Sequence, residues 1–353
     1  MTPKKNQATC LVIVMTLTGC ATVHGSVIST EHRPTPPELE AELRSTVEKL
    51  ATNIGERNCY RTNGLEAAAS WIELQFMAAG FVPRRLPVLV PAGLPYHCGA
   101  MTVWNIEAEK RGITRPNEVI VIGAHYDSKV ATRSWTGVGP PLVNERGTPG
   151  ADDNASGVAA LLAIARGLAG SPTERTVRFV AFVNEERPFY QTDTMGSVVY
   201  ARQCHAVTNE FVVGMISLEM LGCYSAQPHH KRFWFGFASL FGLPAKPNYI
   251  AFLSNGRSCR FARECAEVYR RHSPVSVRTL ALPMMGKLVA WSDDWSFWRQ
   301  GFPAFAATDT AFLRHDHYHE LRDTAEKLDY APMADVVWGL RYAVEALANP
   351  DQK

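Results

Sequence analysis

Runs of apolar residues typical of buried strands alternate with runs of helical spacing along this chain, and the alternation constrains the fold more than any other feature. The strand-like runs are 117–127, 176–186, 211–221, 249–254 and 303–310, and the helix-like runs are 38–50, 65–79, 155–169, 195–204, 261–271 and 331–347. Such alternation favours a mostly parallel sheet with both faces covered. We therefore predict an α/β fold of three layers (αβα) around a central, mostly parallel mixed sheet.

A length of 353 residues is enough to bury a large core, in one big domain or in two smaller ones. The sequence shows neither an internal repeat nor a second stretch typical of a linker between domains. We interpret the Gly- and Pro-rich stretch over 131–150 as an excursion of the chain near a functional site. A single domain is predicted over residues 38–349.

The amino-terminal residues have the pattern of an export signal. Lys4 and Lys5 precede an apolar run over 10–19, and Cys20 follows it. The run is too short to span a bilayer but fits the apolar region of a secretory signal, so we predict that residues 1–19 are a signal peptide. The sequence LTGC, which ends in Cys20, resembles the bacterial lipobox, in which the cysteine becomes the lipidated amino terminus.

The resemblance to a lipobox implies a membrane anchor through lipid on Cys20, and a plain signal peptide cleaved near Ala21 is the alternative. Because no Asp follows the cysteine, the same resemblance implies the periplasmic face of an outer membrane in a host that has one. Residues 20–37 are polar and end in prolines, as expected of a tether between the lipid and the domain.

The net charge and the cysteines of the chain limit which partners and which kinds of metal site are expected. The formal net charge is +2, and removal of Lys4 and Lys5 would leave none, so nucleic-acid binding is not expected. The six cysteines beyond Cys20 are Cys59, Cys98, Cys204, Cys223, Cys259 and Cys265. An oxidising compartment would allow disulfides, and we predict the pairs Cys59–Cys98 and Cys259–Cys265. A cysteine-only zinc site is disfavoured because there is no CxxC pair.

Ionisable residues gather where the predicted strands end. They are His125, Asp127, Asp152, Asp153, Glu185, Glu186, Glu219 and, further along, His319. In an open α/β sheet, functional groups meet beyond the carboxyl ends of the strands. Imidazole and carboxylate ligands together suit zinc, and more than four of them suit a two-metal site.

Five motifs in this region, in this order, resemble those of the M28 zinc peptidases, a family that includes bacterial aminopeptidases and the related glutaminyl cyclases. They are GAHYDS (123–128), GADDNASG (150–157), NEE (184–186), SLEMLG (217–222) and YHELRDT (318–324). The resemblance covers roughly residues 100–330. It implies a phosphorylase/hydrolase-like zinc exopeptidase fold, two zinc ions per chain and peptide substrates.

The resemblance also implies a role for each site residue. The metal ligands would be His125 and Glu219 on one zinc, Glu186 and His319 on the other, and Asp153 bridging both. Glu185 would be the general base, which takes a proton from a zinc-bound water whose pKa is lowered to about 7. Asp127, two residues after His125, would orient the imidazole of that ligand.

Several assignments have alternatives. Asp152 could be the ligand in place of Asp153, and either could cap the following helix. Glu219 stands where an aspartate is commoner, and it could instead be a strand glutamate in a buried salt bridge. His315 and His317 could replace His319 as ligands or lie in a surface loop.

Other ionisable residues are assigned no ligand role. His229 and His230 are interpreted as solvated loop residues. Asp293 and Asp294 either line the pocket or cap the helix through Trp298, and Asp309 and Asp323 could brace loops or hold His319.

The sequence leaves three candidate functions. The first is a co-catalytic zinc aminopeptidase, with carboxypeptidase action by the same fold left open. The second is a glutaminyl cyclase that uses a single zinc, and the third is an inactive binding member of the fold. The retained ligands and Glu185 argue against the third. Serine hydrolases, P-loop enzymes and HExxH proteases are disfavoured because GxSxG, GxxxxGK[ST] and HExxH are absent.

Overall fold

The computed structural model describes residues 34–93, 98–133, 140–142, 144–226, 244, 246–282 and 292–352. The predicted signal peptide, Cys20, most of the predicted tether, and His229 and His230 lie outside the described residues. Across the part of the chain that is described, no helix combines the length and the apolar character that crossing a membrane requires.

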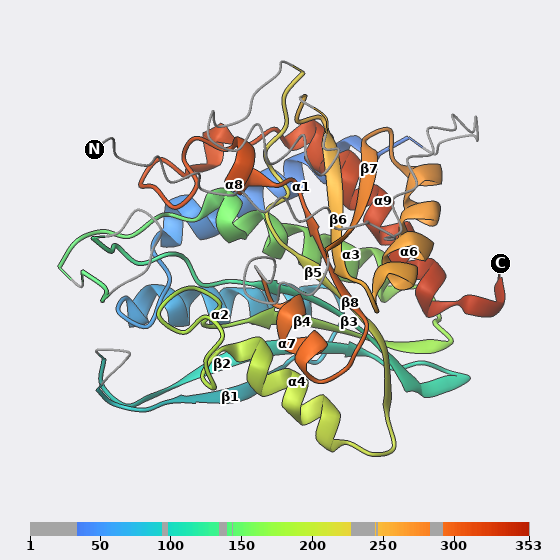
Figure 1. Cartoon of the computed structure of the whole chain (residues 1–353), viewed down its shortest axis with the longest axis horizontal. Helices are drawn as coiled ribbons and strands as arrows, with labels where there is room; N and C mark the ends of the chain where they lie inside the picture. Colours follow the sequence, from blue (N-terminus) through green and yellow to red (C-terminus); the bar gives the residue numbers. More distant parts are fainter. Residues whose placement is uncertain are drawn as a thin grey trace, which may run out of the picture.

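The secondary structure follows the predicted alternation (Figure 1). The helices are α1 (Pro37–Val47), α2 (Thr62–Ala78), α3 (Gly157–Ala169), α4 (Gly196–Ala206), α6 (Cys259–His272), α7 (Asp294–Arg299), α8 (Ala311–Arg314) and α9 (Tyr330–Ala348), with π-helical turns η1 (Glu48–Ile54) and η2 (Ala151–Ser156) and 3-10 turns η3 (Ala325–Lys327) and η4 (Pro350–Gln352). The strands are β1 (Arg84–Val90), β2 (Met101–Lys110), β3 (Arg115–His125), β4 (Arg175–Phe182), β5 (Phe211–Leu218), β6 (Tyr249–Asn255), β7 (Ser276–Leu282) and β8 (Ala304–Thr308).

The described strands form one sheet of eight in the order β1-β2-β4-β3-β5-β8-β6-β7. Its centre is parallel, because β4, β3, β5 and β8 pair parallel in that order. Antiparallel pairs join β1 to β2, β2 to β4 and β6 to β8. The predicted mostly parallel mixed sheet is therefore confirmed.

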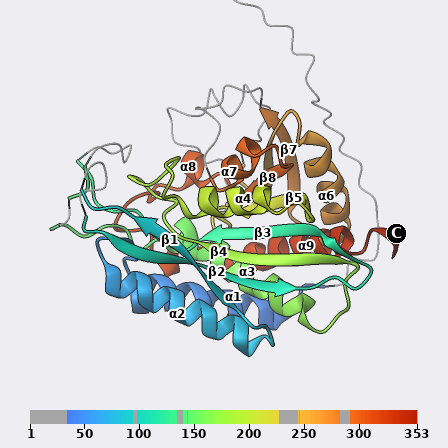
Figure 2. The same ribbon diagram turned by 90° about the horizontal axis from the view of Figure 1, so that it is seen from below.

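Helices cover both faces of the sheet. In Figure 2, α1, α2 and α3 lie on one side of the strands and α4 and α7 on the other. Successive side chains of β3 divide between the faces, as a strand requires. Ile120 and Ile122 pack into the larger core, whereas Val119 and Val121 pack with Phe297 of α7 in the smaller one. This arrangement confirms the three-layer fold.

Strands β1, β2 and β7 were not predicted from the sequence. In β1, residues 84–87 are exposed or half-buried, and Pro87 lies within the strand, which suits its place at the edge of the sheet. Strand β4 ends at Phe182, so Glu185 and Glu186 lie in the turn beyond it.

The predicted disulfides are not formed. Cys59 and Cys98 have free thiols, and Cys59 Sγ donates a hydrogen bond of 2.9 Å to Asn184 Oδ1. No disulfide joins Cys259 to Cys265, because both lie in α6. Six residues of α-helix rise about 9 Å, beyond the Cα separation that a disulfide bridges.

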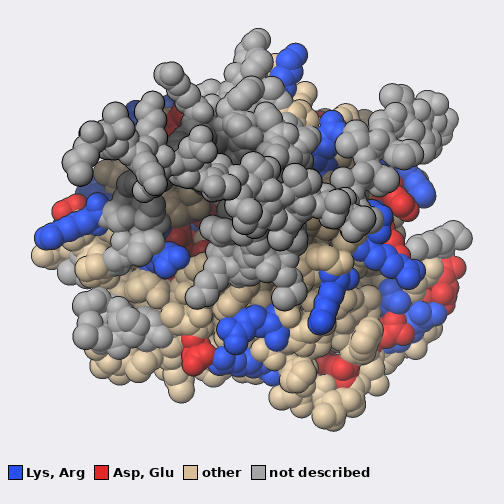
Figure 3. All heavy atoms as spheres, viewed as in Figure 1, with Lys and Arg blue, Asp and Glu red and all other residues tan. Residues whose placement is uncertain are grey.

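Charged side chains are dispersed on the surface seen in Figure 3. Lys and Arg occur in several separate groups on this face, with Asp and Glu among them. The dispersal agrees with a formal net charge of only +2. The expectation that the chain does not bind nucleic acid stays a prediction.

A buried arginine connects three segments of the chain by hydrogen bonds to their backbone carbonyls. Arg57 is fully buried, and its guanidinium donates hydrogen bonds of 2.7–3.0 Å to the backbone carbonyls of Leu50, Gly55, Tyr126, Pro149 and Gly150. Burial lowers its pKa to about 10, so it stays charged at neutral pH. The loop before η2 is thereby fixed to η1 and to the end of β3.

We predict that Arg57→Lys lowers the free energy of unfolding by at least about 3 kcal/mol, because an ammonium cannot serve five carbonyls and leaves buried acceptors unpaired. Urea unfolding followed by circular dichroism measures the change. Arg202→Lys is the matched control: Arg202 is exposed and pairs with Asp193, and we expect a change within about 0.5 kcal/mol. Similar midpoints and slopes for Arg57→Lys and the wild type would contradict the prediction.

Candidate metal centre

The predicted site residues come from separate elements and meet at one edge of the sheet. His125 is the last residue of β3, Glu185 and Glu186 follow β4, and Glu219 follows β5. Asp153 lies in η2, the turn that leads into α3. The carboxyl ends of parallel strands share one edge, which is why these residues converge there.

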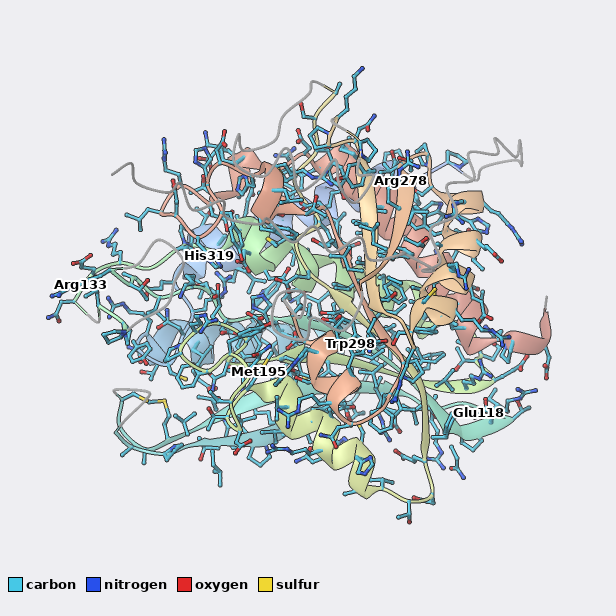
Figure 4. The ribbon with its side chains drawn as sticks, in the orientation of Figure 1. Glu118, Arg133, Met195, Arg278, Trp298 and His319 are labelled. Atoms are coloured by element: carbon cyan, nitrogen blue, oxygen red, sulfur yellow. The ribbon has the colours of Figure 1, made fainter. Side chains whose placement is uncertain are left out.

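His319 reaches this edge from the segment after α8. Figure 4 labels it beside the green ribbon at η2 and the start of α3. Its backbone has a φ of 63°. Its ring stacks on that of Tyr318, with the two centroids 3.8 Å apart, so the imidazole is held from one side.

The first group of donors is His125, Asp153 and Glu219, all buried. His125 Nε2 lies 3.2 Å from Asp153 Oδ1 and 3.4 Å from Glu219 Oε2. His125 Nδ1 lies 3.1 Å from the backbone oxygen of Asp127, which leaves Nε2 to face the other donors.

The second group is Asp153, Glu186 and His319. His319 Nε2 lies 3.1 Å from Asp153 Oδ2 and 3.6 Å from Glu186 Oε1. Asp153 therefore offers one oxygen to each group and is the residue that the two groups share. In each group the donor atoms lie within 4.8 Å of one another.

Both groups fit zinc in donor chemistry and in charge. Each combines one imidazole with carboxylates, the ligand types that zinc takes. Glu186 Oε1 is buried without a hydrogen-bond partner, so a buried acceptor is left for an ion. A cation between these donors would also offset the mutual repulsion of the carboxylates.

Burial and charge shift the pKa values of the donors in opposite directions. Burial raises the pKa of Glu186 to about 7. It would also raise that of Asp153, but hydrogen bonds from His125 and His319 lower the pKa of this carboxyl below its usual value. Burial lowers the pKa of His125, yet the surrounding carboxylates, led by Glu219, outweigh it and hold the pKa well above its usual value.

Glu185 lies beside the first group without belonging to either. Its Oε2 is 3.9 Å from His125 Nε2. Burial raises the pKa of Glu185 well above its usual value. A buried carboxyl next to the donors but outside both groups is placed to exchange a proton with a molecule bound between them.

Asp127 fixes the turn that carries the two glutamates. Its Oδ1 accepts a hydrogen bond of 3.1 Å from the backbone N–H of Glu185, and its Oδ2 accepts one of 3.0 Å from that of Glu186. Its Oδ1 also lies 3.5 Å from His125 Nδ1. Asp127 thus positions three site residues at once.

Asp323 likewise positions the segment Asp152–Asp153, which contains the aspartate shared by the two groups. Its Oδ1 accepts from the backbone N–H of Asp152 at 2.9 Å, and its Oδ2 from that of Asp153 at 3.2 Å. The sequence offered bracing as one role for Asp323, but not these partners, which lie about 170 residues away.

Asp152 does not belong to either group of donors. Its Oδ1 accepts a hydrogen bond of 2.8 Å from the backbone N–H of Gly222, so the side chain faces away from Asp153. Neither aspartate caps α3: Asn154 Oδ1 accepts from the backbone N–H of Gly157 instead.

The longer side chain of Glu219 is held by two residues that sequence reasoning missed. Ser292 Oγ donates a hydrogen bond of 2.8 Å to Glu219 Oε2, and Asn154 Nδ2 lies 3.4 Å from the same oxygen. Asn154 lies inside the motif GADDNASG, so its position beside the ligands was a signal that could have been followed.

The remaining candidates are placed elsewhere. His315 and His317 belong to neither group, and their Nε2 and Nδ1 lie 3.5 Å and 3.8 Å from Asp323 and Glu320 respectively. Asp293 precedes α7 but makes no side-chain cap; it is fully buried, and burial raises its pKa to about 7.

Comparisons with known proteins point to one family. The model of peptidase family M28 matches residues 105–344. The uncharacterized protein YfbL of Escherichia coli is 33% identical over 312 residues, which is 88% of each chain. A probable zinc metalloprotease of the fungus Pyrenophora teres is 30% identical over 217 residues, and the match spans 56% of this chain but only 42% of the fungal protein.

Solved structures with the same fold include enzymes of two kinds. A zinc aminopeptidase from Bacillus subtilis superposes with a TM-score of 0.67 at 15% identity, covering 91% of this chain and 98% of that one. A glutaminyl cyclase from Fimbriiglobus ruber gives a TM-score of 0.62 at 18% identity, covering 90% and 97%. At these identities the likeness shows the fold alone.

We predict that Asp127→Asn weakens zinc binding about 10- to 100-fold, because an amide has one oxygen and cannot accept from both glutamate N–H groups. Competition with a chromophoric chelator measures the affinity. Asp193→Asn, an exposed aspartate paired with Arg202, is the control and is expected to bind zinc as the wild type does. Equal affinity of Asp127→Asn and the wild type would refute the role assigned to Asp127.

Proposed function

The chain belongs to peptidase family M28, a family of zinc peptidases, and we propose that it is an exopeptidase that removes residues from the amino termini of peptides. One observation carries the proposal: two groups of buried donors share Asp153, and Glu185 lies beside them without belonging to either. This arrangement suits hydrolysis of an amide bond held between the two groups.

Each side chain has a distinct task in this proposal. His125 and Glu219 would hold one zinc ion, Glu186 and His319 the other, and Asp153 would lie between them. Bound zinc supplies a Lewis acid, which lowers the pKa of a water and polarises the scissile carbonyl. Hydrolysis then depends on a group that moves the proton of that water.

Glu185 is that group. Its carboxylate accepts the proton of the attacking water at Oε and then donates it to the nitrogen of the departing amine, so it returns to its starting state. Asp127 contributes by holding the backbone N–H of Glu185, which limits where the carboxylate can point.

Glutaminyl cyclase activity is the alternative, because enzymes of that class share the fold with comparable TM-scores. Cyclisation of an amino-terminal glutamine uses no water as a nucleophile, so it does not need two complete groups of donors. The second group, with Glu186 and His319 both close to Asp153, favours hydrolysis.

We predict that Glu185→Gln lowers kcat at least about 100-fold on aminoacyl amides, because glutamine cannot accept the proton. Zinc content should stay at the wild-type level, since Glu185 is not a ligand in the proposal. Glu186→Gln should differ by losing zinc as well as activity. Glu145→Gln, on an exposed loop, is the neutral control. A Glu185→Gln protein that keeps its zinc and most of its turnover would eliminate Glu185 as the general base.

A second prediction separates hydrolase from cyclase. We expect Asp153→Ala to carry two zinc ions fewer than the wild type, measured by mass spectrometry of metals in the purified proteins. The wild type should hydrolyse aminoacyl amides and leave peptides with amino-terminal glutamine uncyclised. Loss of a single ion, together with cyclisation and no hydrolysis, would replace the peptidase proposal by the cyclase.

A further inference from the structure

A second cluster of metal-binding side chains lies outside the candidate metal centre. It consists of Asp152 in η2, Cys223 after β5 and Asp309 after β8. Each offers one ligand atom, and these atoms lie within 4.8 Å of one another. None of the three belongs to the two groups that share Asp153.

The backbone holds the two carboxylates of this cluster in place. Asp152 Oδ1 accepts from the N–H of Gly222 at 2.8 Å. Asp309 Oδ2 accepts from the N–H of Cys223 at 2.6 Å, and its Oδ1 from that of Ala311 at 2.6 Å. Both carboxylates are thus fixed by the backbone at Gly222 and Cys223, two adjacent residues that include the thiol, and have little freedom to move apart.

Asp152 Oδ2 is the observation that indicates a ligand. Asp152 is fully buried, and this oxygen has no hydrogen-bond partner. Buried acceptors without partners are rare, because each one costs roughly 1–3 kcal/mol. The carboxyl group of Asp309 is also fully buried, so negative charge on either aspartate is unfavourable unless a positive ion balances it.

A neighbouring cation does not balance this charge by direct contact. Arg314 is buried close by, but its guanidinium donates to the backbone oxygens of Cys223, Pro247 and Tyr249 and to Thr310 Oγ1. It makes no hydrogen bond to Asp152 or Asp309. The charges of His315 and Arg314 act on Asp152 and Asp309 respectively, yet Asp152 Oδ2 is left without a hydrogen-bond partner.

We propose that Asp152, Cys223 and Asp309 bind a zinc ion of their own, separate from the candidate metal centre. A thiolate with two carboxylates is a donor set for zinc, whereas calcium and magnesium take oxygen ligands alone. A cavity of about 230 Å³ is lined by Cys223, Arg314, His315 and Asp329 among others, so it borders one of the three proposed ligands.

Binding releases the proton of Cys223, which must become a thiolate, and any proton held by Asp152 or Asp309, because burial raises the pKa of both carboxyl groups. Burial, followed by the charge of Asp309, raises the pKa of this thiol, so it is protonated when no ion is bound. The zinc ion takes the place of that proton, which leaves to solvent. Since Asp152 precedes Asp153, such an ion would be connected to the candidate metal centre through the backbone between these two residues.

Cobalt(II) provides a test that the candidate metal centre cannot mimic. The purified full-length protein is stripped with a chelator and titrated with Co²⁺. A thiolate bound to Co²⁺ gives a charge-transfer band in the near ultraviolet, and the proposed ligands of the candidate metal centre include no sulfur. We expect the band in the wild type, its loss in Cys223→Ser, and one metal equivalent fewer in that variant.

Cys98→Ser is the matched control, because Cys98 is half-buried like Cys223 but belongs to none of the metal-binding groups found among the described residues. It should keep the band. If Cys223→Ser does not fold, as judged by circular dichroism, Asp309→Asn retains the thiol and should lower the affinity of the cobalt that gives the band at least about tenfold.

Three results would overturn the proposal: a folded wild type that binds Co²⁺ without the band, a band that survives Cys223→Ser, or an unchanged affinity in Asp309→Asn. The first result would mean that no ion binds through the sulfur of Cys223. Because the band does not depend on hydrolysis, the outcome is independent of the proposed peptidase activity.

Discussion

Burial of carboxylates at one edge of the sheet is the constraint that organises the rest of this structure. Glu185, Glu186 and Glu219 are almost fully buried there together with Asp153, although isolated buried charges are strongly unfavourable. Each carboxylate must therefore be matched by hydrogen-bond donors or by positive charge. Histidine rings and backbone N–H groups supply part of this, and bound cations would supply the remainder.

In the segment Asp152–Asp153, two adjacent carboxylates each need their own hydrogen-bond donors or positive charge. Two aspartates adjacent in sequence face different partners: Asp153 contacts His125 and His319, whereas Asp152 turns to Gly222. Asp323 accepts from both of their backbone N–H groups and so fixes the pair as a unit. Movement of either side chain would therefore displace the other through the backbone between them.

Much of this arrangement could be predicted from the sequence, because it depends on local patterns. Buried strands read as apolar runs, and the motifs around His125 and Asp153 lie where those runs end. The antiparallel edge was harder to predict: β1 is partly exposed and contains Pro87, and the burial of Glu107 in β2 depends on its contacts with Arg84 and Tyr200.

Contacts between distant segments could not be predicted, because they depend on the folded chain and not on local patterns. The hydrogen bonds of Asp323 to η2 and of Ser292 to Glu219 join residues far apart in the sequence, and no periodicity marks such pairs. Free thiols at Cys59 and Cys98 likewise depend on where the folded chain places them. Residue type and spacing identified the candidate ligands, but only the fold shows what holds them.

The hydrogen bonds of Asp127 and Asp323 to pairs of backbone N–H groups involve no metal. We expect a site braced in this way to keep its shape when it is empty, so that it can be stripped and reloaded without unfolding the chain. Intrinsic affinity for nitrogen and oxygen ligands rises toward copper, above zinc. The ion that such a protein carries would then depend on which ions are available in the compartment where it matures, and not on its own folding.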